Sequence, residues 1–539
     1  MAENLLYFGD NLEVMREHMP DASVDLIYLD PPFNSARNYN VLFKQAARDE
    51  NQAQIVAFED TWQWSKLRYD EFFEDVSHAR LFDLMNALHR ILGGCDMMAY
   101  LVMMAPRLFQ MHRVLKPTGS LYLHCDPTAS HYLKLLMDVI FEPGRFRNEI
   151  TWKRQSAHND AKQGRRAFGN IADILLFYTK SDNYTFNTLY TEYSDDYIKS
   201  FYKFSDADGR RYRLSDMTGP GGAAKGNPKF EVMGVTRYWR YSRSRMDDLI
   251  AQGRVVQTKP GTVPQEKRYL DEMPGVALQN IWDDIVPAIR GESLGYPTQK
   301  PLALLERIIN ASSNPGDIVF DPFCGCGTAV VAAEKLGRRW VGIDITYVAV
   351  NLMISRLTRD FGLQRGTDYQ VVNYPRDSYA ARKLFEESPK QFEIWAVSLI
   401  DGGVPQPGKV GDRGLDGKVY FQDLDGKPQY AVVQVKGGKL NTGMIRDFAH
   451  VIEREKAVLG FFISLETPTR GMINEAEELG VYTAPSGRKI PRLQLRTVKE
   501  LMDEGKPFDI PQGYSTRISA TGRAGKALAG ARDQVVIPY

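Results

Sequence analysis

Apolar runs alternate with longer amphipathic stretches over the first 150 residues of the chain. The runs LLYFGD (5–10), VDLIYLD (24–30) and GSLYLHCD (119–126) predict buried strands, and the stretches 98–115 and 131–140 predict helices. The alternation resumes at 316, where DIVF, TAVVAAEKL and RRWVGID form one strand–helix–strand unit. This order of elements predicts an α/β fold whose sheet is built from two separate parts of the chain.

Two further regions have patterns of their own. Residues 152–295 contain Gly/Pro-rich pieces such as TGPGGAAKGNP and show no clean periodicity, which indicates an insertion specialised for contacts. From about 385 to 510 a helix (QFEIWAVSLI), two strands (GKVYF and YAVVQVK), a helix at 444–456 and the strand VLGFFIS predict a separate α/β domain. Residues 511–539 are small, polar and basic, and we expect a flexible tail there.

Composition narrows the class of protein. The chain has 539 residues, 43% of them hydrophobic, and a net charge of +1, so we expect several globular domains and exclude a disordered chain. The most apolar stretch, Met97–Pro106, is shorter than a membrane span and reads as a core helix. The N-terminus does not resemble a signal peptide, and four cysteines are too few for a disulfide framework. We therefore expect a cytoplasmic protein.

Positive charge gathers in two places within the irregular region. The cations there are the candidates for DNA contact: Lys153, Arg154, Arg165, Arg166, Arg237, Arg240 and Arg243. The second group is interleaved with Tyr238, Trp239 and Tyr241, and cations beside aromatic rings suit phosphates and unstacked bases. A solvated surface would show the same charge pattern, so these clusters alone leave both interpretations open.

A glycine-rich turn indicates a nucleoside cofactor. In DPFCGCGT, Gly325 and Gly327 lie between a predicted strand and a predicted helix. Asp344 closes the next strand about 20 residues after Asp321, the spacing at which an acid can bind ribose hydroxyls. The chain continues G-C-G-T-A-V instead of G-x-G-x-x-G, which disfavours NAD.

A second loop carries chemistry suited to an amine. The strand VDLIYL is followed by Asp30, Pro31, Pro32 and Phe33, where the prolines make a rigid loop at the carboxyl edge of the sheet. A carboxylate and a free carbonyl can accept hydrogen bonds from an exocyclic amine, and Phe33 can stack on its ring. Alone, Asp-Pro-Pro is more often just a turn.

Together these motifs resemble the β group of the DNA amino-methyltransferases that use S-adenosylmethionine. The resemblance rests on GDNLEVM (9–15), LDPPFN (29–34), YPTQKP (296–301) and DPFCGCGT (321–328), and it covers about residues 4–360. It implies a Rossmann-like doubly wound sheet in which the catalytic loop precedes the cofactor motif. The implied domains are a catalytic half (1–151), a target-recognition region (152–295) and a cofactor-binding half (296–384).

The resemblance also implies residue roles. Asp30, Pro31, Pro32 and Phe33 would hold a flipped base for in-line methyl transfer, and the cysteines of the turn would only pack. The residues implied to bind the cofactor are Asp10, Thr298, Lys300, Asp321, Phe323, Gly325, Gly327, Thr328 and Asp344. The expected product is N6-methyladenine in double-stranded DNA, with N4-methylcytosine as the alternative and RNA or protein methylation as more distant ones.

The C-terminal domain presents a second candidate site. Gln434 and Lys436 share one face of a predicted strand, where Asp416 of the preceding strand can join them and Glu393 is an additional candidate. The carboxylate of Asp416 and the amide oxygen of Gln434 suit Mg²⁺, and a lysine can orient an attacking water. This arrangement resembles the Mrr-like restriction endonucleases, which implies a role in restriction-modification or phage defence.

Other interpretations of this domain stay open. The hairpin can carry ordinary surface side chains, the domain can bind DNA without cutting it, or DNA cleavage can be the main activity of the protein. The chain can also act as a homodimer or with other restriction-modification or defence subunits.

Overall fold

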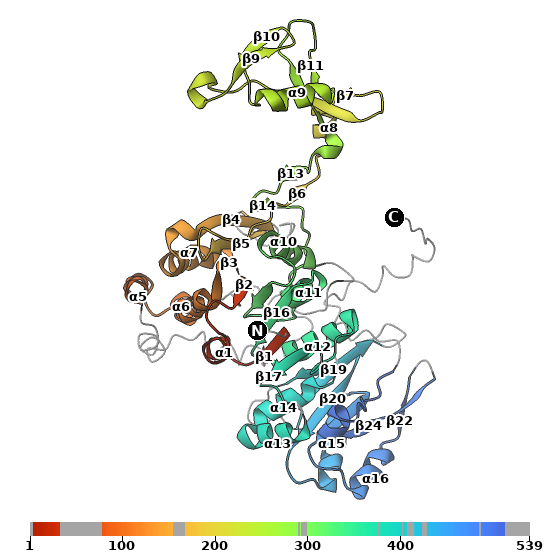
Figure 1. The fold of residues 1–539 in the computed structure, drawn as a ribbon. Coiled ribbons are helices and arrows are strands. Elements are labelled where there is room, and N and C mark those ends of the chain that lie inside the picture. Colours follow the sequence, from red (N-terminus) through yellow and green to blue (C-terminus); the bar gives the residue numbers. More distant parts are fainter. Residues whose placement is uncertain are drawn as a thin grey trace. The chain divides into compact units, whose positions relative to one another are not determined.

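The computed structural model describes residues 4–32, 78–154, 168–288, 292, 299–375, 377–400, 403–406, 414–422, 428–484 and 487–511. The chain divides into two compact units, Thr188–Gln279 on one hand and Met1–Asn187 with Asn280–Tyr539 on the other. Within the described residues, the larger unit contains a nine-stranded sheet, a five-stranded sheet and one two-stranded hairpin (Figure 1).

The first sheet of the larger unit has nine strands in the order β14-β4-β5-β3-β2-β15-β16-β1-β17. Within it only β5 runs antiparallel to its neighbours. The strands are β1 (Asn4–Phe8), β2 (Val24–Leu29), β3 (Leu115–Cys125), β4 (Phe146–Lys153), β5 (Ala172–Thr179), β14 (Ile281–Trp282), β15 (Ile318–Asp321), β16 (Arg339–Asp344) and β17 (Tyr369–Val372). The predicted strand–helix alternation is confirmed, and β15 lies in the middle of the sheet between β2 and β16.

Helices pack on both faces of this nine-stranded sheet. One face carries α1 (Asn11–His18), α5 (Ala79–Leu92), α6 (Asp96–Val114) and α7 (Pro127–Phe141), which share a core with Leu121 and Leu123 of β3. The other carries α10 (Leu302–Ser312) and α11 (Thr328–Lys335), and Tyr122 of β3 bonds there to Ser312. α12 (Tyr347–Phe361) follows β16. In the described part of the chain, no helix is both long and apolar enough to cross a membrane.

Local capping explains one boundary that the periodicity misses. The helix expected at 131–140 begins at Pro127, because the Asp126 carboxylate accepts a 2.7 Å hydrogen bond from the Thr128 N–H and proline suits the first turn of a helix. The apolar stretch before Arg107 is confirmed as a core helix, α6.

The second sheet of the larger unit has five strands in the order β18-β19-β20-β21-β24. β18 (Gly403–Pro405), β19 (Gly417–Gln422) and β20 (Pro428–Lys436) are antiparallel, and β21 (Leu459–Ser464) and β24 (Leu493–Thr497) continue parallel to β20. Around it lie α13 (Ser378–Glu387), α14 (Pro389–Ser398), α15 (Thr442–Arg454), α16 (Arg470–Glu478), α17 (Val498–Met502) and the hairpin β22 (Val481–Thr483) with β23 (Lys489–Pro491). The predicted strands and helices are present in this region, which belongs to the same compact unit as the nine-stranded sheet.

The smaller unit is built from short elements. They are β6 (Tyr190–Thr191), α8 (Asp195–Phe201), β7 (Phe204–Ser205), β8 (Arg211–Asp216), β9 (Lys229–Val232), β10 (Val235–Tyr238), α9 (Arg243–Ala251), β11 (Val255–Val256), β12 (Gln265–Tyr269) and β13 (Val276–Ala277). Its core contains Trp239, Met246 and Leu249.

This unit is shorter than the insertion expected at 152–295. The apolar run ADILLFYT forms β5 between β3 and β4, and residues 281–282 add β14 beside β4. These segments therefore belong to the nine-stranded sheet, because their strands pair with it along their length.

Candidate active site

The two predicted motifs meet at one edge of the nine-stranded sheet. Val319 and Phe320 of β15 pair in parallel with Leu26 and Ile27 of β2, so the segments after these strands leave the sheet side by side. We call Asp30–Pro32, which follows β2, the catalytic loop, and residues 322–327, which follow β15, the cofactor loop. Ligands bind at the carboxyl ends of parallel strands, and here the two loops share that edge.

Glycine is required where the cofactor loop turns back into the sheet. Gly325 and Gly327 have φ angles of 51° and 75°, and a Cβ on Gly327 would lie 2.5 Å from Cγ of Met353. The Gly325 N–H donates to Oδ2 of Asp344 over 2.8 Å, which ties the loop to the end of β16. The glycines therefore let the loop pack closely against Met353 and the end of β16.

Acidic side chains converge at this edge. Burial raises the pKa of Asp321 to about 8, and the nearby charges of Asp30 and Asp344 add to the rise, although its carboxylate accepts a hydrogen bond from the Phe323 N–H. Burial also raises the pKa of Asp344 to about 6, against hydrogen bonds from Thr346 and Gly325. Near neutral pH the Asp321 carboxyl is therefore largely protonated, and a cationic ligand would favour its ionised form.

Asp30 forms an ion pair with a lysine that is distant in the sequence. Nζ of Lys300 donates to Oδ2 of Asp30 over 2.5 Å, although 270 positions separate them, and both side chains are mostly buried. Pro31 is buried and Pro32 half-buried behind it. Lys300, predicted from the motif before the cofactor strand, therefore lies against the catalytic loop.

Asp10 lies in a network that the sequence did not reveal. Its carboxylate caps α1 through the Leu12 N–H at 2.7 Å and accepts from Nη2 of Arg107 at 2.6 Å. Arg107 also donates to Asn11, whose amide donates in turn to the Pro322 carbonyl at 2.8 Å. Asn11 and Arg107 thus connect α1 and α6 to the cofactor loop. The one feature of the sequence that could have indicated this network is Arg107, a charged residue inside an apolar helix.

The cysteines of the cofactor loop pack in the interior. Cys324 and Cys326 are buried, and burial raises the pKa of both thiols. Among the predicted site residues, Phe33, Thr298, Arg165 and Arg166 lie outside the described residues.

Comparison with known proteins identifies the family of the chain. The DNA methylase family (N6_N4_Mtase) matches residues 24–355, which include both loops. The chain belongs to the DNA methylase family.

Three curated relatives show how far the similarity extends. The type II methyltransferase M.EcaI of Enterobacter cloacae is 34% identical over 48% of this chain and 57% of its own length. The StyLTI Mod subunit, a type III restriction-modification enzyme of Salmonella typhimurium, is 27% identical over 62% of this chain and 50% of its own. The DNA adenine methyltransferase YhdJ of Escherichia coli is 26% identical over 65% of this chain and 81% of its own. The chain thus spans only about half the length of the first two relatives.

The residues predicted for the second site lie outside residues 24–355, the region that the family matches. They also lie near one another. The antiparallel register Gly417–Val433 continues so that Asp416 lies opposite Gln434. Oδ2 of Asp416 accepts from the Val435 N–H at 2.7 Å, and burial raises its pKa to about 6. Glu393 of α14 and Lys436 are close enough to act on this pKa, Glu393 raising it and Lys436 lowering it.

Gln434 has an unused acceptor. Its side chain is 5% exposed and its amide nitrogen donates to the Gly414 carbonyl at 3.0 Å. Its Oε1 is buried and accepts no hydrogen bond from any residue that the structure describes. The described residues contain no group of three or more His, Cys, Asp or Glu side chains placed to bind a metal.

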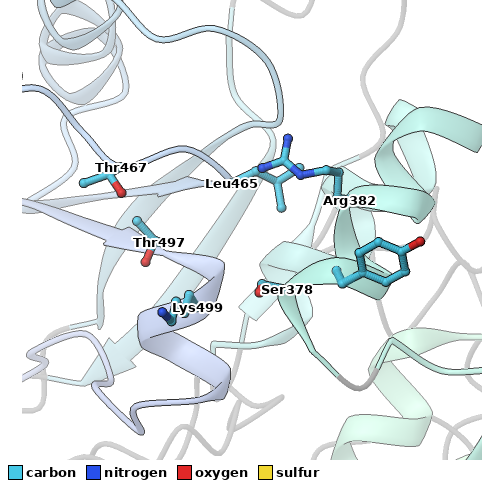
Figure 2. Close-up of a pocket in the computed structure, with 7 residues that line it drawn as sticks. Ser378, Arg382, Leu465, Thr467, Thr497 and Lys499 are labelled. Carbon is cyan, nitrogen blue, oxygen red and sulfur yellow. The ribbon is translucent and has the colours of Figure 1, made fainter.

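A separate cleft of about 290 Å³ lies in the same region (Figure 2). It is lined by Ser378, Tyr379, Arg382, Leu465, Thr467, Thr497 and Lys499. None of the predicted site residues lines it.

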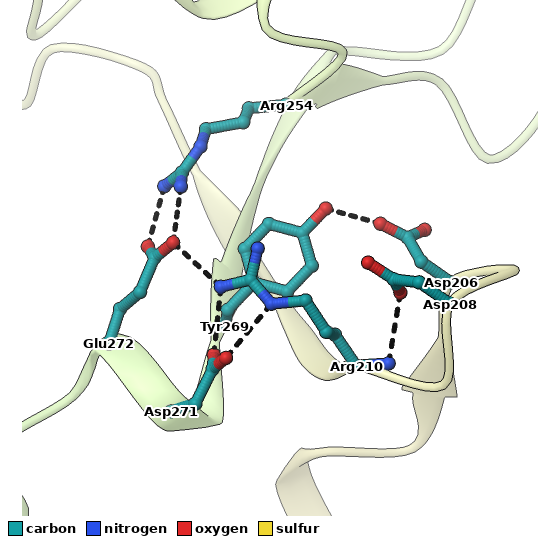
Figure 3. Close-up of polar contacts among 7 residues, drawn as sticks. All are labelled: Asp206, Asp208, Arg210, Arg254, Tyr269, Asp271 and Glu272. Carbon is teal, nitrogen blue, oxygen red and sulfur yellow. Dashed lines mark hydrogen bonds and ion pairs between the residues drawn. The ribbon is translucent and has the colours of Figure 1, made fainter.

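The cations of the smaller unit fall into two classes. Arg210 and Arg254 both bind Glu272, Arg210 also binds Asp271, and the ring of Tyr269 lies against both guanidinium groups (Figure 3). This cluster joins β8, β11 and β12 by neutralised pairs.

The arginines of this unit that were predicted to contact DNA have fewer acidic partners. Arg237 on β10 is exposed and has no acidic partner among the described residues. Arg240 donates to the Thr218 carbonyl and lies 3.9 Å from Asp216, and Arg243 pairs with Asp247 on an exposed face. In the larger unit, Lys153 is exposed, whereas Arg154 pairs at 3.3 Å with the buried Asp173.

Proposed function

We propose that this chain is a site-specific DNA methyltransferase that transfers a methyl group from S-adenosylmethionine to the N6 amine of a flipped adenine. One observation carries the proposal: the Asp30–Pro32 loop and the glycine-rich cofactor loop leave adjacent parallel strands at the same edge of the sheet. A methyl donor on one loop and an amine on the other would then meet there.

The residues present fit this cofactor. Burial, with smaller contributions from the charges of Asp30 and Asp344, raises the pKa of Asp321, and a cationic ligand would favour its ionised form. We assign the ribose hydroxyls to Asp344, and the methionine part to Asp321 and the half-buried Phe323 and Gly325 of the cofactor loop. When bound, S-adenosylmethionine supplies an electrophilic methyl group on a sulfonium centre.

The catalytic loop would orient the amine. Lys300 occupies Oδ2 of Asp30, so Oδ1 is the oxygen left to accept a hydrogen bond from the amine, together with the Pro31 carbonyl. These acceptors draw the nitrogen towards a tetrahedral geometry with its lone pair directed at the methyl group. The ion pair with Lys300 keeps the carboxylate aimed while the base enters.

Adenine is preferred over cytosine for two reasons. The catalytic loop begins with aspartate, which is more often associated with N6-adenine than with N4-cytosine in the resembling family, and a relative that matches 65% of this chain is named a DNA adenine methyltransferase. N4-cytosine methylation is the alternative. We propose that unit 188–279 reads the target in double-stranded DNA within a restriction-modification or defence system.

The loop assignment is tested with Asp30→Asn, which keeps the side-chain shape. We expect transfer of labelled methyl to DNA to fall by at least about 100-fold, because a positioned hydrogen-bond acceptor contributes roughly two to three orders of magnitude. The dissociation constant for S-adenosylmethionine should stay within about twofold, since Asp344 and the cofactor loop are intact. A variant that keeps wild-type transfer would contradict the assignment of this loop.

A second candidate function is Mg²⁺-dependent DNA cleavage by the C-terminal domain. It is favoured by the unpartnered Oε1 of Gln434 next to the buried carboxylate of Asp416. These two oxygens would hold Mg²⁺, the Glu393 carboxylate is a candidate for a third ligand, and Lys436 would orient the attacking water.

This candidate predicts nicking or cleavage of plasmid DNA with Mg²⁺, lost in Asp416→Ala and Lys436→Ala. Because the pKa of Asp416 is about 6, metal affinity should fall as the pH decreases through 6. Lys439→Ala, beyond the strand, is the matched control. Intact plasmid at every pH and metal concentration would leave this domain without nuclease activity.

A further inference from the structure

A row of buried polar side chains crosses the nine-stranded sheet near the catalytic loop. The hydroxyl of Tyr28 on β2 lies 2.9 Å from Nδ1 of His124 on β3, and Nε2 of that ring lies 3.1 Å from Oδ2 of Asp173 on β5. Arg154, just after β4, pairs with the other oxygen of Asp173 at 3.3 Å. We call Tyr28, His124, Asp173 and Arg154 the polar row.

Stability alone does not account for the polar row. His124 is fully buried and Asp173 is 4% exposed, among apolar neighbours such as Leu123 and Leu175. Buried charged pairs are often no more stabilising than apolar side chains of the same volume, because removing them from water costs as much as they gain. The hydrogen-bonded part of the row, Tyr28–His124–Asp173, does, however, fix the directions of its members, whereas Arg154 joins Asp173 as an ion pair only.

The strand register places the polar row next to Asp30. Leu29 of β2 pairs in parallel with Leu123 of β3, so the next residues along each chain, Asp30 and His124, come at the same level. Tyr28 lies two residues before Asp30, which directly follows the last residue of β2. Burial raises the pKa of Tyr28 well above its ordinary value, and the Asp30 charge contributes, which also indicates that the two lie close together.

The imidazole ring is held on every side that the described residues show. A carboxylate can only accept, so Nε2 of His124 carries the proton towards Asp173, and in the neutral ring Nδ1 accepts from Tyr28. Trp152 meets the ring edge-on at 5.7 Å and is itself fixed by a 3.0 Å bond from its Nε1 to the Ile285 carbonyl. Burial opposes ionisation of Asp173, but His124, Lys300 and Arg154 together lower its pKa, so it remains an anion.

We propose that Tyr28 and His124 are positioning residues for methyl transfer: through the Tyr28–His124–Asp173 chain they fix the end of β2 and hence the aim of Asp30. This inference rests on the proposed function. Neither residue contacts the reacting atoms, so their removal should lower the rate of the chemical step and leave ligand binding unchanged.

The register of the sheet supplies a matched control. Tyr122 of β3 is the direct partner of Tyr28, is equally buried, and forms a 2.8 Å hydrogen bond between its hydroxyl and that of Ser312. Tyr28→Phe and Tyr122→Phe each remove one buried hydroxyl bond from the same level of the sheet. Only the first lies in the chain that leads to Asp173.

The experiment measures kcat, the KM for DNA, the dissociation constant for S-adenosylmethionine and the melting temperature of the full chain. We expect Tyr28→Phe and His124→Gln to lower kcat at least about tenfold, since a misplacement of reacting groups by about 1 Å costs roughly 100-fold. KM and the dissociation constant should stay within about twofold of wild type, and Tyr122→Phe should keep wild-type kcat.

Other results overturn the inference. A Tyr28→Phe enzyme with wild-type kcat, an equal loss of kcat in Tyr122→Phe, or a Tyr28→Phe chain that is unfolded at the assay temperature would each assign the row to structure alone. If the wild-type chain transfers no methyl group to DNA, the proposed function fails instead, which is a separate result.

Discussion

Gly342 in β16 is the position where one methyl group should disturb the cofactor loop without touching a ligand. A Cβ at this residue would lie 2.6 Å from Sγ of Cys324, 3.2 Å from Val330 and 3.4 Å from Leu6. Its φ angle is outside the left-handed region, so alanine brings only this overlap. Cys324 must therefore move, and it directly precedes Gly325, whose N–H binds Asp344.

The size of the effect follows from the packing. Inserting a methyl group into a packed core costs about 1–3 kcal/mol. If the Gly342→Ala chain relieves that strain by shifting the cofactor loop, the binding of S-adenosylmethionine must restore the loop, and affinity falls by about 5-fold to 150-fold. The loss should appear in the dissociation constant measured by calorimetry.

A double mutant separates overlap from other causes. Cys324→Ala removes the sulfur that the new methyl group meets, so Gly342→Ala with Cys324→Ala should recover most of the affinity lost by the single glycine variant. Gly144→Ala, where the added methyl group meets open space, should bind like wild type. Unchanged affinity in Gly342→Ala, or no recovery in the double mutant, would refute the claim that packing of Cys324 against Gly342 holds the cofactor loop in its binding position.

Two further predictions concern charge. Because the folded-state pKa of Asp321 is about 8 against an ordinary 3.8, its contribution to stability is complete below pH 4 and lost as the pH rises through 8. Without cofactor at pH 9, the free energy of unfolding of Asp321→Asn in urea should therefore exceed that of wild type by at least about 1.4 kcal/mol. A wild-type chain that is equally stable at pH 4 and pH 9 would contradict the raised pKa of Asp321. Arg237→Ala should reduce the slope of log affinity against log salt concentration by about 0.9, the value for one phosphate contact. Arg210→Ala, which breaks a neutralised pair, should leave that slope unchanged. Equal slopes for the two variants would remove β10 from the DNA interface.

The fold could be predicted wherever one strand or helix carries its own pattern. Apolar runs marked β1, β2, β15 and β16, and the period of two placed Asp416, Gln434 and Lys436 on one face, as the hairpin register bears out. The run ADILLFYT was equally apolar, but it stands within a Gly/Pro-rich and basic context, and its place beside β3 depends on pairing with distant residues.

Contacts between distant segments could not be predicted. The ion pair of Lys300 with Asp30 and the bond from Asn11 to Pro322 join residues that are 270 and 311 positions apart, and no local pattern encodes either. His124 appears in the sequence only as one polar residue in an apolar strand. Its meaning depends on the order of β2, β3 and β5 in the sheet, which tertiary packing decides.

The most direct test of the central claim is incubation of the full chain with unmethylated plasmid DNA and labelled S-adenosylmethionine, followed by digestion to nucleosides. The account predicts label in N6-methyladenine, absent when Asp30→Asn replaces the wild-type chain. Label in N4-methylcytosine would keep the site and change the base, whereas DNA without label would contradict the claim that this sheet edge methylates DNA.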